Sequence, residues 1–186
     1  MAKTSSSMLP LGTKAFEFSL LDVVSGKVVN LNAHSTNTAT VVMFICNHCP
    51  YVKHINPEII RIAQDYTSKN VRFIAISSND ITAYPDDAPE KMKETALELG
   101  YPFPYLFDET QEVAMAYEAK CTPDFYVFDK ELALVYRGQL DDSRMGNQDE
   151  LTGKSIRDVL TCLLENKPIP SGDQKPSLGC GIKWKS

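Results

Sequence analysis

Two apolar runs without alternation, residues 41–45 and 71–77, constrain the fold of this chain more than any other feature. A strand with one solvated face alternates apolar and polar residues, so unbroken runs are typical of strands buried on both faces. The stretch between the runs has apolar residues at steps of three and four, which indicates a helix with one buried stripe. Strand, helix and strand in this order predict a right-handed βαβ unit in a sheet that helices cover.

The predicted helix contains Pro57, which allows two interpretations. Either Pro57 kinks a continuous helix, or Asn56 caps a new helix with Pro57 at its first position. The remaining predicted elements are short strands over residues 16–31, helices over residues 89–99, 110–117 and 156–164, and a β-hairpin over residues 125–137. This order predicts an α/β fold with a central mixed β-sheet and helices on both faces.

Length and charge limit the class of protein. The 186 residues suit one domain. We expect a flexible N-terminus over residues 1–11, a folded domain over residues 12–166 and an irregular tail over residues 167–186 that docks on the domain. With 19 basic and 24 acidic side chains, the net charge of −5 does not favour a nucleic-acid partner. No apolar stretch approaches the roughly 20 residues that span a bilayer, so no membrane partner is expected.

The five cysteines point to a reducing compartment. Their number is odd, and it is too small for a disulfide scaffold in a chain of this length. Residues 1–12 contain no apolar run of the kind that a secretory signal needs. We therefore expect a cytoplasmic protein whose thiols serve chemistry.

The motif Cys46-Asn47-His48-Cys49 lies directly between a predicted buried strand and a predicted helix. Two thiols at this spacing can close a small disulfide ring, and the first would face unpaired N–H groups and the positive end of the helix dipole. We expect this position to lower the pKa of Cys46, and His48 to stabilise the thiolate further. A thiol of pKa about 8.5 is only about 3% ionised at pH 7, whereas one of pKa about 6 is about 90% ionised. The motif therefore predicts a redox-active Cys46–Cys49 pair.

A metal site is the less favoured interpretation of the same motif. A structural zinc site needs a second pair of ligands at similar spacing, whereas Cys121, Cys162 and Cys180 each stand alone. A metal-binding or copper-handling module would have to combine Cys46 and Cys49 with a histidine or Cys121. We therefore expect no metal and no cofactor.

A second motif, Cys121-Thr122-Pro123, precedes the predicted hairpin, and a proline at the start of a strand can follow a cis peptide bond. Together with the βαβ unit and the Cys-x-x-Cys motif, it resembles the thioredoxin fold. The N-terminal segment of residues 15–31 resembles the redoxin branch, which includes the AhpC/TSA peroxiredoxins and the TlpA-type thiol reductases. Residues 47–52, 120–124 and 179–185 of this chain resemble the corresponding segments of an uncharacterised peroxiredoxin-like family with the thioredoxin fold.

The resemblance implies a thioredoxin-like fold with an N-terminal β extension, and a thiol–disulfide oxidoreductase that serves redox homeostasis. It implies that Cys46 attacks a disulfide and that Cys49 resolves the mixed disulfide. It also implies that Pro123 is a cis-proline facing the pair and that the backbone of Thr122 binds an extended substrate peptide. The expected partners are disulfide-containing proteins or small thiols, and a thioredoxin- or glutathione-type redox protein.

A peroxiredoxin-like thiol peroxidase is the alternative function. In that reaction Cys46 becomes a sulfenic acid that another cysteine of the chain resolves. Peroxiredoxins carry a threonine and a proline where this chain has Met43 and Ala39, which argues against peroxide reduction. Arg137 is the candidate for the cationic partner of the reacting sulfur.

The other candidate residues have less specific surroundings. Cys121 and Cys180 are candidate accessory thiols, because Cys121 adjoins the proline and Cys180 lies between two glycines in the tail. We expect Cys162 to be a spectator on the last helix. The acidic pairs Asp86-Asp87 and Asp141-Asp142 are typical of solvated turns.

Overall fold

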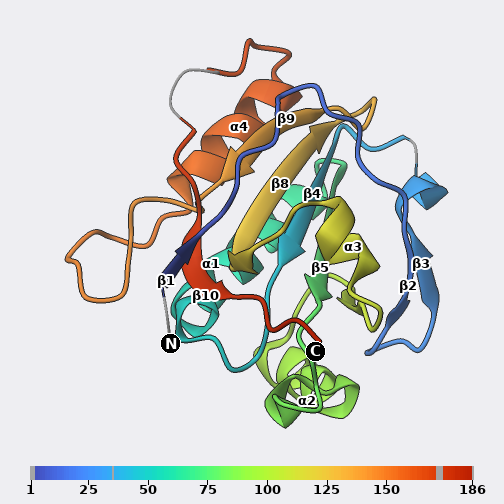
Figure 1. The fold of residues 1–186 in the computed structure, drawn as a ribbon. Coiled ribbons are helices and arrows are strands. Elements are labelled where there is room, and N and C mark those ends of the chain that lie inside the picture. Colours follow the sequence, from blue (N-terminus) through green and yellow to red (C-terminus); the bar gives the residue numbers. More distant parts are fainter. Residues whose placement is uncertain (1–2, 35, 171–173, 186) are drawn as a thin grey trace.

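A seven-stranded mixed sheet forms the centre of the computed structural model (Figure 1). The structure describes residues 3–34, 36–170 and 174–185. In the strand order β3-β2-β6-β5-β4-β8-β9, the central β4 (Ala39–Phe44) and β5 (Val71–Ser77) are parallel. Helix α1 (Pro50–Thr67) joins them, which confirms the predicted βαβ unit. Every residue of β4 is buried, as its unbroken apolar pattern predicts.

The other strands extend this sheet on both sides. On one side, β6 (Tyr105–Phe107) runs parallel to β5, and β2 (Ser19–Asp22) and β3 (Val28–Asn30) follow in antiparallel pairs. On the other side, β8 (Asp124–Asp129) and β9 (Leu134–Gly138) form the predicted β-hairpin, with β8 antiparallel to β4. The sheet is therefore mixed, as predicted.

Two hydrophobic cores cover the two faces of the sheet. Helices α1, α2 (Pro89–Leu99) and α4 (Lys154–Leu164) contribute to the core that contains Val41 of β4. The short helix α3 (Glu112–Ala116) contributes to the core that contains Val42. Neighbouring residues of a strand point to opposite faces, so β4 supplies both cores. The two 3₁₀ helices are η1 (Leu31–His34) and η2 (Pro85–Asp87).

Helix α1 is continuous and contains Pro57 in its interior. The interpretation in which Asn56 caps a second helix is therefore wrong. Cys49 is the N-cap residue and Pro50 is the first helical residue, a position where the missing N–H of proline costs no hydrogen bond. The helix thus begins directly at the second cysteine of the motif.

A second, three-stranded sheet brings both ends of the chain to the start of α1. β1 (Lys3–Ser5), β10 (Leu178–Gly181) and β7 (Cys121–Thr122) pair antiparallel in the order β1-β10-β7. Figure 1 shows β1 lying beside β10 near the start of α1. The segment over residues 1–11, which the sequence predicts to be flexible, thus contains β1, where β10 offers a backbone edge to pair with. The tail lies against the rest of the protein through β10.

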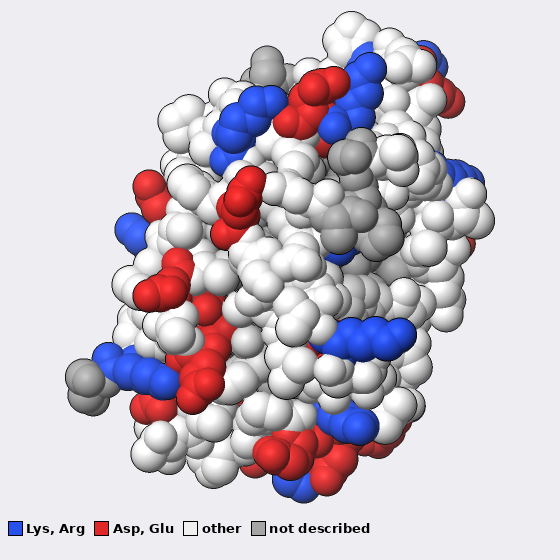
Figure 2. All heavy atoms as spheres, turned by 90° about the vertical axis from the view of Figure 1, so that its right-hand side faces the viewer, with Lys and Arg blue, Asp and Glu red and all other residues white. Residues whose placement is uncertain are grey.

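The surface carries charges of both signs. On the side of the molecule where Figure 1 draws β2 and β3, Lys and Arg side chains are interspersed with Asp and Glu (Figure 2). Interspersed charges of this kind produce no extended field of one sign. Among the helices of the described residues, none is long and apolar enough to cross a membrane.

Candidate redox site

Three segments of the chain meet at the N-terminus of α1. Cys46 lies in the turn directly after β4, and Cys49 is the N-cap of α1. The peptide bond between Thr122 and Pro123, which links β7 to β8, is cis, as predicted. Strand β10 lies along β7 and places Cys180 opposite Thr122. The fold therefore brings the two motif cysteines, the cis-proline and one of the candidate accessory thiols to one place.

The two motif thiols are buried and share Thr122 as a partner. Cys46 is 2% exposed and Cys49 is 0% exposed. The sulfur of Cys46 lies 3.2 Å from Oγ1 of Thr122, and the sulfur of Cys49 lies 3.2 Å from the carbonyl oxygen of Thr122, to which it donates when it is protonated. Both sulfurs therefore lie within 3.2 Å of atoms of the same residue, which places them side by side at the start of α1.

The two thiols of the pair differ in pKa. The thiol of Cys46 donates to Cys49 and lowers the pKa of Cys49 to about 5, against the effect of burial. The thiol of Cys180 and the backbone N–H groups of Val52 and Cys180 support the same shift. The pKa of Cys46 is raised, because its thiol donates to Cys49, because it is buried, and because the Asp87 carboxylate is near. The prediction of a lowered pKa at Cys46 is therefore wrong, because the hydrogen bond to Cys49, burial and the Asp87 carboxylate all oppose its ionisation.

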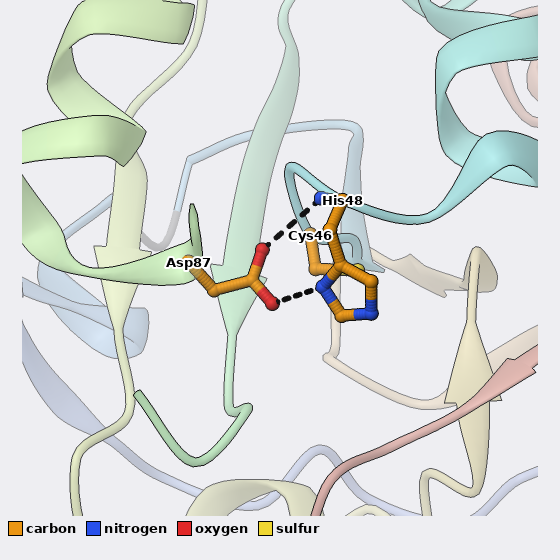
Figure 3. Close-up of side chains that lie close together, drawn as sticks. All are labelled: Cys46, His48 and Asp87. Atoms are coloured by element: carbon orange, nitrogen blue, oxygen red, sulfur yellow. Dashed lines mark hydrogen bonds and ion pairs between the residues drawn. The ribbon is translucent and has the colours of Figure 1, made fainter. Parts of the chain in front are cut away.

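His48, between the two cysteines, is held by Asp87 (Figure 3). Nδ1 of His48 lies 2.5 Å from Oδ2 of Asp87. Oδ1 of Asp87 accepts the backbone N–H groups of Asn47 at 2.8 Å and of His48 at 3.2 Å. Asn79 donates to the same carboxylate at 2.8 Å, and the imidazole ring stacks on Tyr84. One buried carboxylate thus fixes both the backbone of the turn and the ring between the cysteines.

The sequence patterns missed Asp87 as a site residue. It was expected to be solvated, but it is 0% exposed. It ends η2, about forty positions after the motif, and only the packing of η2 against the turn reveals its role. Asp141 was also expected to be solvated, yet it is buried and accepts backbone N–H groups of Ser143, Thr152 and Gly153. An Asp-Asp pair in a loop therefore does not show by itself which carboxylate is buried.

Cys46, His48 and Asp87 form the one group of potential metal ligands found among the described residues, with ligand atoms within 4.8 Å of one another. Both oxygens of Asp87 already accept hydrogen bonds, and one of them engages Nδ1 of His48. Nε2 of His48 is buried and has no hydrogen-bond partner in the part of the chain that the structure describes. A metal held here would use Nε2 and the Cys46 sulfur, with Asp87 orienting the ring. Two such ligands fill only half of a tetrahedral zinc site.

Cys180 is 1% exposed, and its thiol hydrogen-bonds to Cys49. Burial, followed by this hydrogen bond, raises the pKa of Cys180 to about 12. Its strand also occupies the backbone edge of Thr122 where the resemblance places a substrate peptide. A peptide that pairs with Thr122 along this edge has to displace β10.

Cys121 and Arg137 belong to a separate buried group. Arg137 is 0% exposed and donates to Asp124 at 3.1 Å. Burial raises the pKa of Asp124 to about 6 in spite of this ion pair. Burial and then the Asp124 carboxylate raise the pKa of Cys121, whose thiol points toward the carbonyl of Pro123 at 3.9 Å. Arg137 is thus the partner of Asp124 rather than of the Cys46 sulfur.

Known proteins match this chain at two levels of similarity. The model of the AhpC/TSA family matches residues 11–137. An uncharacterized conserved protein from Geobacillus kaustophilus is 59% identical, with a TM-score of 0.97 over 100% of this chain and 97% of that one. A hypothetical protein from Sinorhizobium meliloti 1021 is 40% identical, with a TM-score of 0.95 over 98% of this chain and 99% of that one. Among curated proteins, none matches significantly.

More distant solved structures show the fold. The thioredoxin domain of a thiol-disulfide oxidoreductase from Bacteroides vulgatus is 15% identical, with a TM-score of 0.63 over 82% of this chain and 99% of that one. This likeness confirms the predicted thioredoxin-like fold. The family match covers more than half of the chain and includes both Cys46–Cys49 and the cis-proline segment. The chain therefore belongs to the AhpC/TSA family.

Proposed function

We propose that the protein is a thiol–disulfide oxidoreductase that acts through the Cys46–Cys49 pair. The observation that supports this most is the placement of both buried sulfurs 3.2 Å from atoms of Thr122, at the N-terminus of α1 and beside the cis-proline Pro123. The pair loses its first proton at a pH well below the ordinary pKa of a thiol, so it holds one negative charge at neutral pH. The thiolate is the form of cysteine that attacks a disulfide.

The reaction consists of two exchange steps. Cys46 attacks a substrate disulfide, its proton passes to Cys49 along the hydrogen bond, and one substrate sulfur leaves as a thiolate. Cys49 then attacks Cys46 of the mixed disulfide, the Cys46–substrate bond breaks, and the second substrate sulfur leaves with the bonding electron pair and takes up the proton that Cys49 loses. The substrate gains two electrons, and the pair is left as the Cys46–Cys49 disulfide.

A groove beside the turn offers a path for the substrate. Asn47 and His48, the two residues after Cys46, line it together with Lys53 of α1 and Lys91 and Glu94 of α2. Its mixed charges suit a polar segment of a disulfide-containing protein or a small charged disulfide. Neither motif cysteine is among the residues that line the groove, and we assign the first attack to Cys46 because the resemblance to the thioredoxin fold implies that role.

Regeneration of the pair requires a reductant. Opening the Cys46–Cys49 disulfide takes two electrons, which a thioredoxin- or glutathione-type thiol can supply by the same exchange chemistry. We propose the cytoplasm as the compartment, because such thiols are kept reduced there.

Exchange with glutathione disulfide tests the proposed function. The reduced protein is mixed with glutathione disulfide, quenched by alkylation and mapped by mass spectrometry; formation of a Cys46–Cys49 disulfide is expected. Cys46→Ser should abolish this product, whereas Cys162→Ser is the matched control and should react normally, because Cys162 lies on α4 outside the site. Undiminished release of glutathione in a protein lacking both Cys46 and Cys49 would contradict the proposal.

A thiol peroxidase in which Cys46 becomes the sulfenic acid is the second candidate, favoured by the low pKa of Cys49, because the Cys49 thiolate can take up the proton of Cys46. A thiolate at a helix start is the form that attacks peroxide and becomes a sulfenic acid. Two features weigh against it: Met43 is buried in the core where a hydroxyl is required, and Arg137 is engaged by Asp124. Substoichiometric hydrogen peroxide followed by mass spectrometry separates the candidates, since oxidation no faster than that of free cysteine would reject the peroxidase.

A further inference from the structure

Strand β10 places a third thiol against the proposed redox pair, and the exchange reaction described above makes no use of it. Cys180 lies opposite Thr122 in the register of β10 and β7, and the carbonyl oxygen of the same Thr122 lies 3.2 Å from the sulfur of Cys49. Cys46 and Cys180 both influence the pKa of Cys49, so Cys49 has one neighbouring thiol from its own motif and one from the tail. Because a sulfur forms a disulfide with one partner at a time, these two neighbours define two alternative disulfides of Cys49.

The glycines on either side of Cys180 allow this contact. A Cβ atom at Gly179 would lie 2.0 Å from the carbonyl oxygen of Thr122, so a side chain there would push β10 away from β7. A Cβ atom at Gly181 would lie 3.2 Å from Oγ1 of Thr4 in β1. The backbone around Cys180 thus lies closer to its neighbours than a strand with ordinary side chains could.

Hydrogen bonds before and after β10 hold it in this place. Before the strand, the N–H of Ser177 donates to Oγ of Ser6 at 3.0 Å. After the strand, the N–H of Ile182 donates to the carbonyl of Lys120 at 3.0 Å. The third thiol is therefore presented to the pair by an anchored strand.

We propose that Cys180 is a third redox cysteine, which displaces Cys46 from Cys49 and forms a Cys49–Cys180 disulfide. This inference rests on the proposed function, because it starts from the Cys46–Cys49 disulfide that substrate reduction leaves. The sulfur of Cys180 attacks Cys49, the Cys49–Cys180 bond forms, and the Cys46–Cys49 bond breaks. Cys46 leaves with the bonding electron pair and takes up the proton that Cys180 loses. The step is an isomerisation and needs no further oxidant or reductant.

The isomerisation has a consequence for turnover. It returns Cys46 to the thiol state beside the groove while the disulfide moves to the C-terminal strand. The sulfur that meets the substrate is then separate from the disulfide that the reductant has to open.

Disulfide mapping of the full-length Cys46→Ser variant tests the inference, with Cys121 and Cys162 also replaced by serine so that Cys49 and Cys180 are the remaining thiols. Glutathione disulfide is the oxidant: Cys49 forms a mixed disulfide with glutathione, and Cys180 displaces the glutathione. The expected product is a crosslink between the tryptic peptides that contain Cys49 and Cys180, with loss of both alkylatable thiols.

Two further proteins separate the inference from the proposed function. In a Cys180→Ser protein that keeps Cys46, glutathione disulfide should yield a Cys46–Cys49 disulfide, and adding Cys180→Ser to the Cys46→Ser variant should stop the reaction at the mixed disulfide on Cys49. If the Cys180→Ser protein closes Cys46–Cys49 while the Cys46→Ser variant with Cys180 present also stops at the mixed disulfide, the role of Cys180 is overturned and the proposed function stands. If the Cys180→Ser protein forms no disulfide within the motif, it is the proposed function that fails.

Discussion

Asp87 holds the imidazole of His48 at 2.5 Å, and the charge of the same carboxylate opposes ionisation of Cys46. Both effects come from one buried side chain that reaches the motif from η2. Because Asp87 disfavours a charge on Cys46 while backbone N–H groups and two thiols favour one on Cys49, the negative charge of the reduced pair resides on Cys49.

Asp87→Asn should lower the pKa of Cys46, because it removes the negative charge near that sulfur. It should also destabilise the protein by about 1–3 kcal/mol, since the buried N–H donors lose a charged acceptor. The pKa is measured from the pH dependence of Cys46 alkylation in a Cys49→Ser background. Asp86→Asn is the control, because that neighbouring side chain is exposed and should leave the profile unchanged. An unaltered Cys46 profile in Asp87→Asn would remove Asp87 from the electrostatics of the pair.

Cys46→Ala should raise the pKa of Cys49 from about 5 toward the ordinary range of a thiol, because the hydrogen bond from Cys46 is the largest contribution to the shift. Cys46→Ser should raise it less, since a hydroxyl can still donate. The alkylation rate of Cys49 as a function of pH gives both values. Equal pKa values in the parent and in Cys46→Ala would show that the helix start alone accounts for the shift.

Gly179→Ala should loosen β10, because the new Cβ would overlap the carbonyl of Thr122. Overpacking of this kind costs about 1–3 kcal/mol of stability. Cys49 and Cys180 should then be alkylated faster in the native protein, and the crosslink between them should diminish. Gly181→Ala is the milder comparison, because the atom it approaches is a side-chain hydroxyl of Thr4 that can move. Native labelling rates that are the same in the parent and in Gly179→Ala would contradict the close packing of β10.

Asp124 should give the stability a defined pH dependence. Its pKa of about 6 in the folded protein lies above the unfolded value of about 3.9. The folded state therefore binds the extra proton, so this group makes stability fall as pH rises from about 4 to about 6, by at most about 1.4 kcal/mol per pH unit. Urea unfolding across this range should show a smaller fall in Asp124→Asn than in the parent. A fall of equal size in both proteins would assign the titration to another group.

The sequence patterns predicted the parts of the fold that depend on neighbours in the chain. The βαβ unit was predictable from the unbroken apolar pattern of β4 and β5 and from the spacing of apolar residues within α1. Both patterns involve residues that are close together in the sequence, so they can be recognised without knowledge of the fold. The Thr122-Pro123 motif likewise identified the cis bond. These features place Cys46 and Cys49 at the start of a helix without any tertiary information.

The parts that depend on distant partners were not predictable in the same way. β10 consists of Leu178-Gly179-Cys180-Gly181, which has no strand pattern, and it forms because β1 and β7 lie on either side of it. Asp87 follows another aspartate in a loop, and only the fold shows that it is buried against the motif. The predicted lowering of the Cys46 pKa failed as well, because that pKa depends on the hydrogen bond to Cys49, on burial and on the distant Asp87 carboxylate.

Titration of the thiolate by its ultraviolet absorbance, in the full-length protein and in Cys49→Ser, tests the charged state of the pair most directly. The expected result is one thiolate that forms with a midpoint near about pH 5 in the parent and is lost in Cys49→Ser. If thiolate absorbance in both proteins rises only around pH 8.5, as for free cysteine, the pair is uncharged at neutral pH and the proposed exchange mechanism is contradicted.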